Sequence, residues 1–174
     1  MTLIDSTHHE YRIWSEFMAS AYREAIRSPD PSTQTAAALA VGRTPYSSGT
    51  YRLAHNRIHP SIEPNYTDRE EKLARVTHAE SAAIYAAANA GLCTRGATMV
   101  CPWADCTRCA LAIIESGISR LILHKQRMEL PSRWSDQITQ ALGWISRHGI
   151  QIDYLHATFP DCQPILIEGK KWQP

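Results

Sequence analysis

At 174 residues the chain has the length of one domain, and we expect residues 1–174 to form a single domain with its own hydrophobic core. Its 44% hydrophobic and 20% charged residues are ordinary for a globular protein, and no apolar run approaches the roughly 18 residues that a membrane span needs. A net charge of +1 without a basic stripe argues against a long nucleic acid as partner, whereas a small substrate with one phosphate needs only a few cations.

The N-terminal segment and the cysteines favour a cytoplasmic protein. The first twelve residues, MTLIDSTHHEYR, contain neither a basic flank before an apolar stretch nor a small-residue cleavage site. Thiols stay reduced in the cytoplasm, and the five cysteines are an odd number, so a close cysteine pair indicates metal binding or catalysis more than a disulfide. We therefore expect a cytoplasmic location and no membrane partner.

The first half of the chain predicts one helix and a strand hairpin. Apolar residues recur at helical spacing from His8 to Arg27, and the prolines of the following SPDPS prevent continuation of the helix. Residues 35–41 and 50–56 are short strand-like segments separated by the turn formers TPYSSG, so they predict paired strands. Residues 57–75 predict a long surface excursion, a kind of loop that often carries function.

Helices and strands alternate in the second half. The alanine-rich helix there ends at a glycine, and a strand, a helix and a strand then follow in the order of a parallel crossover. The predicted elements are helices at 78–91, 106–116 and 134–149 and strands at 97–101, 118–124 and 150–155. Together these elements predict a three-layer α/β/α domain, with a mixed sheet of about five strands and helices on both faces.

Two short motifs each begin a predicted helix: His-Ala-Glu at residues 78–80 and Cys-x-x-Cys at residues 106–109. One imidazole and two thiolates leave the fourth tetrahedral position of Zn²⁺ open, as in catalytic sites, and helix N-termini help thiols to ionise. Neither motif is sufficient alone, because residues 8–10 also read His-x-Glu and a Cys-x-x-Cys can be a redox pair. Their combination predicts a catalytic zinc site, with Glu80 as the proton shuttle and not a ligand.

These motifs and their surroundings resemble the cytidine deaminase superfamily, and in particular its deoxycytidylate (dCMP) deaminase branch. SPDPSTQT at residues 28–35 is similar to the DPST segment of that branch, and AHNRIHPSIEP at 54–64 is similar to its asparagine-bearing segment. RVTHAESAAIYAAANAG at 75–91 and CTRCALAIIESGISRLIL at 106–123 resemble its two metal-binding helices. The resemblance covers residues 10–124 and implies a cytidine-deaminase-like fold.

The resemblance also implies a function and a set of site residues. It implies zinc-dependent hydrolytic deamination of a cytosine nucleotide, with dCMP as the favoured substrate and dUMP and ammonia as products. His78, Cys106 and Cys109 would bind Zn²⁺, and Glu80 would move protons. Substrate contacts would come from Asn56 to the sugar, the backbone near Ala79 to the base, Ser32 and Gln34 to the nucleotide, and Arg27 or Arg57 to the phosphate. Because relatives assemble as oligomers, the resemblance implies a homo-oligomer.

Other functions stay open. Within the superfamily the substrate could be cytidine, a modified cytosine nucleotide or adenosine in RNA, although the missing basic stripe argues against RNA. A protein of another class would be a non-catalytic zinc-binding or thiol-redox module, which predicts a fourth protein ligand or a reversible disulfide.

Three residues near the Cys-x-x-Cys have more than one interpretation. Asp105 stands directly before the first cysteine of the motif, where the family usually has proline, and it can cap the following helix. Cys101 ends a predicted strand and is interpreted as a buried small hydrophobe. Trp103 could stack on a substrate base or simply pack in the core.

Overall fold

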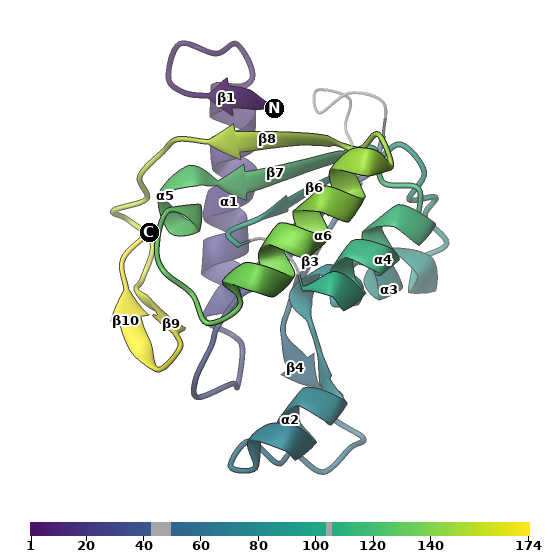
Figure 1. Cartoon of the computed structure of the whole chain (residues 1–174), viewed down its shortest axis with the longest axis vertical. Coiled ribbons are helices and arrows are strands. Elements are labelled where there is room, and N and C mark those ends of the chain that lie inside the picture. The colour runs from purple at the N-terminus through teal and green to yellow at the C-terminus, as the bar shows by residue number, and fades with distance from the viewer. Residues whose placement is uncertain (43–49, 104–105) are drawn as a thin grey trace.

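The computed structural model describes residues 1–42, 50–103 and 106–174, which are organised around a six-stranded sheet (Figure 1). The strands of this sheet are β1 (Thr2–Ile4), β2 (Ala36–Ala40), β3 (Tyr51–His55), β6 (Thr98–Cys101), β7 (Arg120–His124) and β8 (Gln151–Leu155). The helices are α1 (Tyr11–Ala25), α2 (Arg69–Arg75), α3 (Ala79–Asn89), α4 (Thr107–Glu115), α5 (Lys125–Met128) and α6 (Ser135–Arg147). Two small sheets pair β4 (Arg57–Ile58) with β5 (Val76–Thr77) and β9 (Ile165–Ile167) with β10 (Lys170–Trp172).

The large sheet is mixed, with strand order β1-β8-β7-β6-β2-β3. Strands β6, β7, β8 and β1 run parallel to one another, and β2 is antiparallel to both β3 and β6. The predicted parallel crossover from β6 to β7 and the predicted pairing of β2 with β3 are thus confirmed. The turn formers of that hairpin, at 44–49, lie outside the described residues, as does Asp105.

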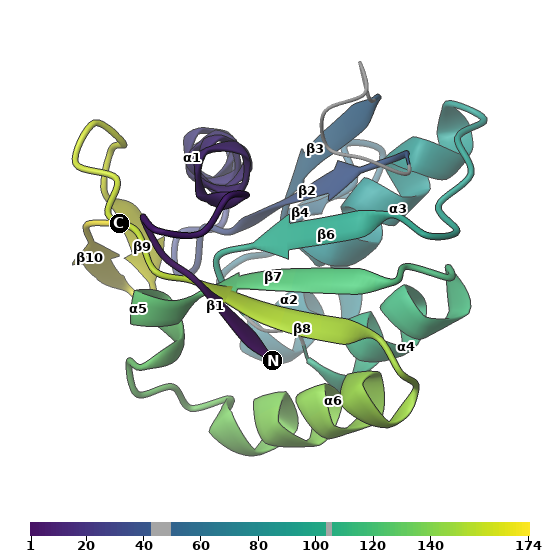
Figure 2. The ribbon, with the colours of Figure 1, turned by 90° about the horizontal axis from the view of Figure 1, so that it is seen from above.

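Helices cover both faces of the sheet, which confirms the three-layer prediction (Figure 2). Helices α3, α4 and α6 lie on one face, and α1 lies on the other. The crossovers β6-α4-β7 and β7-α6-β8 step across the sheet in the same direction, and crossovers of one hand then place both helices on the same face. This arrangement brings α4 against both α3 and α6.

The central strands are buried on both faces, and this explains their continuous apolar sequences. In β7, Leu121 and Leu123 pack with the layer of α3, α4 and α6, whereas Ile122 packs with the layer of α1. In β6, Met99 belongs to the first layer, as does Cys101, which is buried as expected. A sheet with two covered faces holds its strand ends in fixed positions, and the candidate site lies at such ends.

Several parts of the described structure were not predicted. The sheet has six strands instead of about five, because Thr2–Ile4 pairs in parallel with β8 as an edge strand. The predicted surface excursion at 57–75 contains β4 and α2, and α2 begins where the side chain of Asp68 accepts a hydrogen bond from the backbone N–H of Glu71. Near the C-terminus, β9 and β10 form an additional hairpin. These elements are short, so they carry little periodicity in the sequence.

Among the described helices, none combines the length and the apolar character required to cross a membrane.

Replacement of a central core residue tests the packing of the sheet. Leu121 is fully buried in β7, so Leu121→Ala should lower the free energy of unfolding by about 2–5 kcal/mol, because the lost contacts leave a cavity. Leu111 on α4 is exposed, and Leu111→Ala should change it by less than about 0.5 kcal/mol. Urea unfolding at one fixed zinc concentration measures both values, and equal effects would contradict the observed layering.

Candidate functional site

Two helix starts bring the predicted metal ligands together. His78 is the N-cap residue of α3 and Cys106 is the N-cap residue of α4, and both have extended backbone with ψ of 155° and 168°. Cys109 lies in the first turn of α4. Because α3 and α4 pack against each other, their N-terminal ends hold these three side chains side by side.

The geometry of the three side chains suits a metal ion. Nδ1 of His78 lies 3.3 Å from Sγ of Cys106 and 3.4 Å from Sγ of Cys109. In a tetrahedral site with Zn–S of about 2.3 Å and Zn–N of about 2.0 Å, ligand atoms are roughly 3.5 Å apart. The three donor atoms all lie within 4.8 Å of one another, so imidazole and two sulfurs fit zinc without rearrangement.

The surroundings of Cys106 favour its thiolate form, which is the form that binds a metal ion. A hydrogen bond from Cys109, assisted by His78, lowers the pKa of Cys106 to about 3, against the opposing effect of burial. The hydrogen bond with Cys106 in turn raises the pKa of His78. Cys106 is therefore a thiolate at neutral pH even before a metal binds, and a divalent cation would displace any proton on His78.

Glu80 lies directly beside this donor set. It is in the first turn of α3, its side chain is 6% exposed, and Oε2 is 3.3 Å from Sγ of Cys109. Among the described residues, the metal-ligating group consists of His78, Cys106 and Cys109 and does not include Glu80. A buried carboxylate next to a metal centre, but outside its ligand set, is suited to proton transfer.

A cavity of about 240 Å³ opens onto the metal ligands and Glu80. His78, Glu80 and Cys106 form part of its wall. Apolar and aromatic side chains form another part: Tyr66, Leu73, Val76, Trp103, Trp134 and Ile138. Polar groups that converge in a largely apolar cavity are typical of a small-molecule site.

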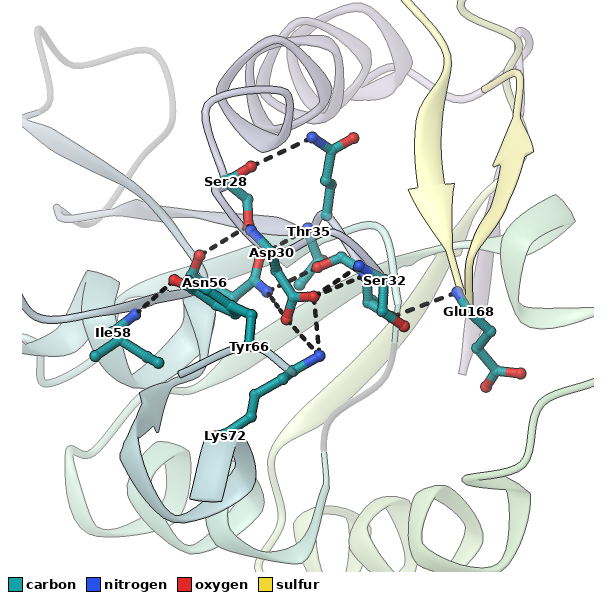
Figure 3. A network of polar contacts seen from close by, with 11 residues as sticks. Ser28, Asp30, Ser32, Thr35, Asn56, Ile58, Tyr66, Lys72 and Glu168 are labelled. Atoms are coloured by element: carbon teal, nitrogen blue, oxygen red, sulfur yellow. Dashed lines mark hydrogen bonds and ion pairs between the residues drawn. The ribbon is translucent and has the colours of Figure 1, made fainter. Parts of the chain in front are cut away.

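The segment after α1 forms a further wall of the cavity and is held by a buried carboxylate (Figure 3). Asp30 is 2% exposed, and its Oδ1 accepts hydrogen bonds from the backbone N–H groups of Ser32 and Thr33 at 2.9 and 3.1 Å. The ammonium group of Lys72, on α2, lies 2.8 Å from the same carboxylate. Lys72 thus connects α2 to the loop at residues 30–35, and both line the cavity.

Asn56 also lines the cavity, and most of its hydrogen-bonding capacity is used within the protein. Its Nδ2 group donates to the carbonyl of Thr33 at 2.8 Å and to Oδ2 of Asp30 at 3.4 Å. Its Oδ1 accepts from the backbone N–H of Thr35 at 3.0 Å. An amide oxygen has two lone pairs, so Oδ1 can accept one more hydrogen bond, whereas both Nδ2 protons are engaged.

Of Ser32 and Ala79, only Ser32 is part of the cavity lining. Ser32 lines the cavity, and its hydroxyl makes no hydrogen bond to any residue in the described ranges. Ala79 is fully buried and lies between His78 and Glu80 at the start of α3. Its backbone is therefore next to the metal ligands.

Gln34, Arg27 and Arg57, like Ala79, are not part of the cavity lining. The side-chain carbonyl of Gln34 accepts a hydrogen bond from the backbone N–H of Leu166, and this contact fixes the C-terminal hairpin. Arg27 is 71% exposed and pairs with Glu24, and Arg57 donates to the carbonyl of His55. Their contacts with the nucleotide stay predictions.

Sequence reasoning missed several lining residues. Arg69 and Lys72 belong to α2, and Arg133 and Trp134 come just before α6. The excursion at 57–75 was expected to carry function, but nothing in its composition distinguishes these side chains from surface charges. Trp103 does line the cavity. The guanidinium carbon of the buried Arg127 lies 4.1 Å from the centroid of the Trp103 ring.

Removal of one sulfur ligand tests the metal centre. Cys106→Ser should reduce bound zinc from about one ion per chain to near zero, because the set would keep only two strong ligands. Cys93→Ser, at an exposed position, should leave the zinc content unchanged. Elemental analysis of both purified proteins gives the answer, and a full zinc content in Cys106→Ser would refute the assignment.

Comparison with known proteins connects this geometry to a family. Residues 12–125, well over half of the chain, match the family model described as the cytidine and deoxycytidylate deaminase zinc-binding region. A relative from Aliivibrio fischeri, named as an uncharacterized deaminase in the luxG 3' region, is 29% identical over 128 residues. That match covers 74% of this chain and 83% of the relative.

Solved structures share the fold. A dCMP deaminase from cyanophage S-TIM5 in apo form matches with a TM-score of 0.61 at 16% identity, over 82% of this chain and 97% of that chain. The same enzyme in complex with dCMP and dUMP matches with a TM-score of 0.63 at 17% identity, over 84% and 99%.

A third solved structure is a diaminohydroxyphosphoribosylaminopyrimidine deaminase/5-amino-6-(5-phosphoribosylamino)uracil reductase from Thermotoga maritima. It matches with a TM-score of 0.54 at 20% identity, over 84% of this chain and 37% of that chain. The likeness to these structures confirms the predicted fold. With the match over residues 12–125 and the histidine and two cysteines gathered at one point, the chain belongs to the zinc-binding cytidine and deoxycytidylate deaminase family.

Proposed function

We propose that the protein is a zinc-dependent hydrolase that deaminates a cytosine nucleotide, with dCMP as the favoured substrate and dUMP and ammonia as products. One observation carries the proposal: Glu80 is buried beside a three-ligand metal set, at the wall of a cavity large enough for a base. Family membership supports deamination. The cyanophage enzyme of the same fold was solved with dCMP and dUMP, and this supports the choice of substrate.

In the proposed mechanism, Glu80 carries the protons. Zinc, when bound, lowers the pKa of a water molecule to about 7 and thereby supplies the nucleophile for carbon 4 of the cytosine ring. Glu80 accepts a proton from the attacking water and donates it to the ring nitrogen beside that carbon. It then takes the second proton of that water from the hydroxyl group now bonded to carbon 4 and transfers it to the departing amino group, so that ammonia leaves and the ring becomes uracil.

The opposite wall would orient the nucleotide. The remaining lone pair on Oδ1 of Asn56 can accept a hydrogen bond from a sugar hydroxyl, and the hydroxyl of Ser32 can donate to or accept from the same region. The backbone near Ala79 would hydrogen-bond the base, and Trp103 offers a flat apolar surface to it. Gln34, Arg27 and Arg57 stay predictions for contacts farther along the nucleotide.

A structural zinc site would have a different donor set. Such sites usually surround the metal with four protein ligands, whereas the described residues bring together three. Three protein ligands leave a position open for water, so this arrangement favours catalysis over a purely structural role.

Two wider expectations belong to this proposal: a cytoplasmic location and assembly into a homo-oligomer. Tyr85 on α3 is an exposed aromatic side chain, and a helix surface of this kind is compatible with contact between subunits.

Ammonia release from a substrate panel tests the proposed function. The zinc-loaded protein is incubated with dCMP, CMP, deoxycytidine, dCTP and adenosine, and release is followed with a coupled assay. We expect the highest kcat/KM with dCMP. Preference for another member of the panel would reassign the substrate, and no release from any of them would overturn the enzymatic function.

The role of Glu80 is tested separately. Glu80→Gln keeps the size of the side chain but cannot shuttle protons, so kcat should fall by about 10²–10⁴-fold while zinc content stays the same. Glu115→Gln, near the exposed end of α4, is the matched control and should keep full activity. A zinc-loaded Glu80→Gln protein with unchanged kcat would count against the mechanism.

A further inference from the structure

Two arginines from distant segments approach the same tryptophan at the cavity. Arg69 is the first residue of α2, and Arg133 comes directly before Trp134, which precedes α6. The guanidinium carbons of Arg69 and Arg133 lie 5.8 and 5.7 Å from the Trp134 ring centroid. All three side chains line the cavity that also contains Glu80. The indole therefore holds two positive charges next to the substrate space.

The carboxylates that line the cavity do not neutralise the positive charges of these two arginines. Of the lining carboxylates, Asp30 is paired with Lys72 at 2.8 Å, and Glu80 lies beside the metal ligands. Arg133 has a long contact of 3.7 Å with Glu168, and both side chains are partly exposed to solvent. In the described ranges Arg69 makes no hydrogen bond or ion pair with its guanidinium group. Two arginines thus keep free donors toward the cavity.

We infer that Arg69 and Arg133 form a clamp for the phosphate monoester of the substrate, and that this clamp makes the enzyme prefer a 5'-mononucleotide over the nucleoside. The inference rests on the proposed function, because it assigns the phosphate end of the same substrate whose base meets Glu80. A phosphate monoester carries a charge of about −1.5 to −2 at neutral pH, which two guanidinium groups can balance. Arginine also binds phosphate oxygens through two parallel N–H donors.

The clamp differs from the phosphate contacts that the sequence suggested. Arg27 is directed toward Glu24 and Arg57 toward the carbonyl of His55, and neither lines the cavity. Lys72 lines it but is engaged by Asp30, and its loss would disturb the loop at residues 30–35. Among the cavity-lining residues that the structure describes, Arg69 and Arg133 are the arginines whose guanidinium N–H groups are available to bind a phosphate.

Binding of the product dUMP to the zinc-loaded protein tests the clamp without the need for turnover. In calorimetric titrations, Arg69→Gln and Arg133→Gln should each weaken dUMP binding about tenfold or more, because each removes charge-assisted hydrogen bonds to phosphate. Binding of deoxyuridine, which lacks phosphate, should not change. In kinetics, the same variants should raise KM for dCMP by a similar factor and leave kcat/KM for deoxycytidine unaltered.

Three further variants serve as comparisons. Arg147→Gln removes one positive charge from the last turn of α6, away from the cavity lining, and should leave dUMP binding unchanged. Arg27→Gln and Arg57→Gln test the competing phosphate partners. If either of them weakens dUMP binding while Arg69→Gln and Arg133→Gln do not, the clamp is refuted.

Failure of the clamp can be distinguished from failure of the proposed function. If dCMP is deaminated but dUMP binding does not depend on Arg69 or Arg133, the clamp is wrong and the function stands. If dUMP binding depends on both arginines but no substrate releases ammonia, the clamp stands and the proposed function fails. If the zinc-loaded protein does not bind dUMP at all, the clamp is also refuted.

Discussion

The close packing of α3 against α4 is the constraint on which the site depends. The two helices begin next to each other, so the N-cap histidine of α3 meets the N-cap cysteine and the first-turn cysteine of α4 at a common point. The buried residues of α3 are small: Ala82, Ala83 and Ala87 lie in the same core cluster as Ala110 and Ile113 of α4. Larger residues at those positions would overpack the core and shift α3, and with it His78.

The second wall of the cavity has a different basis, a polar network instead of an apolar interface. Asp30 connects the loop after α1, the amide of Asn56 and the ammonium group of Lys72 through hydrogen bonds and one ion pair (Figure 3). A buried carboxylate is stable only when such partners satisfy it, so these three segments keep their positions together. The network thereby gives the excursion at 57–75 a defined place beside the metal ligands.

The central elements and the metal ligands could be predicted from the sequence, but the rim of the cavity, formed by Arg69 and Arg133, could not. Helices such as α1 and α6 show a clear apolar stripe. His78, Cys106 and Cys109 lie in two short motifs that can be recognised from neighbouring residues alone. β1 has three residues and is defined by its pairing with β8, a contact between opposite ends of the chain. Arg69 and Arg133 come together only after folding, because 57–75 and the start of α6 have no local signal that relates them.

The separate origins of the metal ligands and the rim have a consequence for how such an enzyme can diversify. The metal ligands and Glu80 lie at the starts of α3 and α4, two helices whose inner residues belong to the core, where most substitutions would destabilise the fold. Arg69 and Arg133 are exposed and outside the core clusters. Selection could therefore exchange these side chains at little cost in stability, and one scaffold could acquire new substrates while its chemistry stays the same.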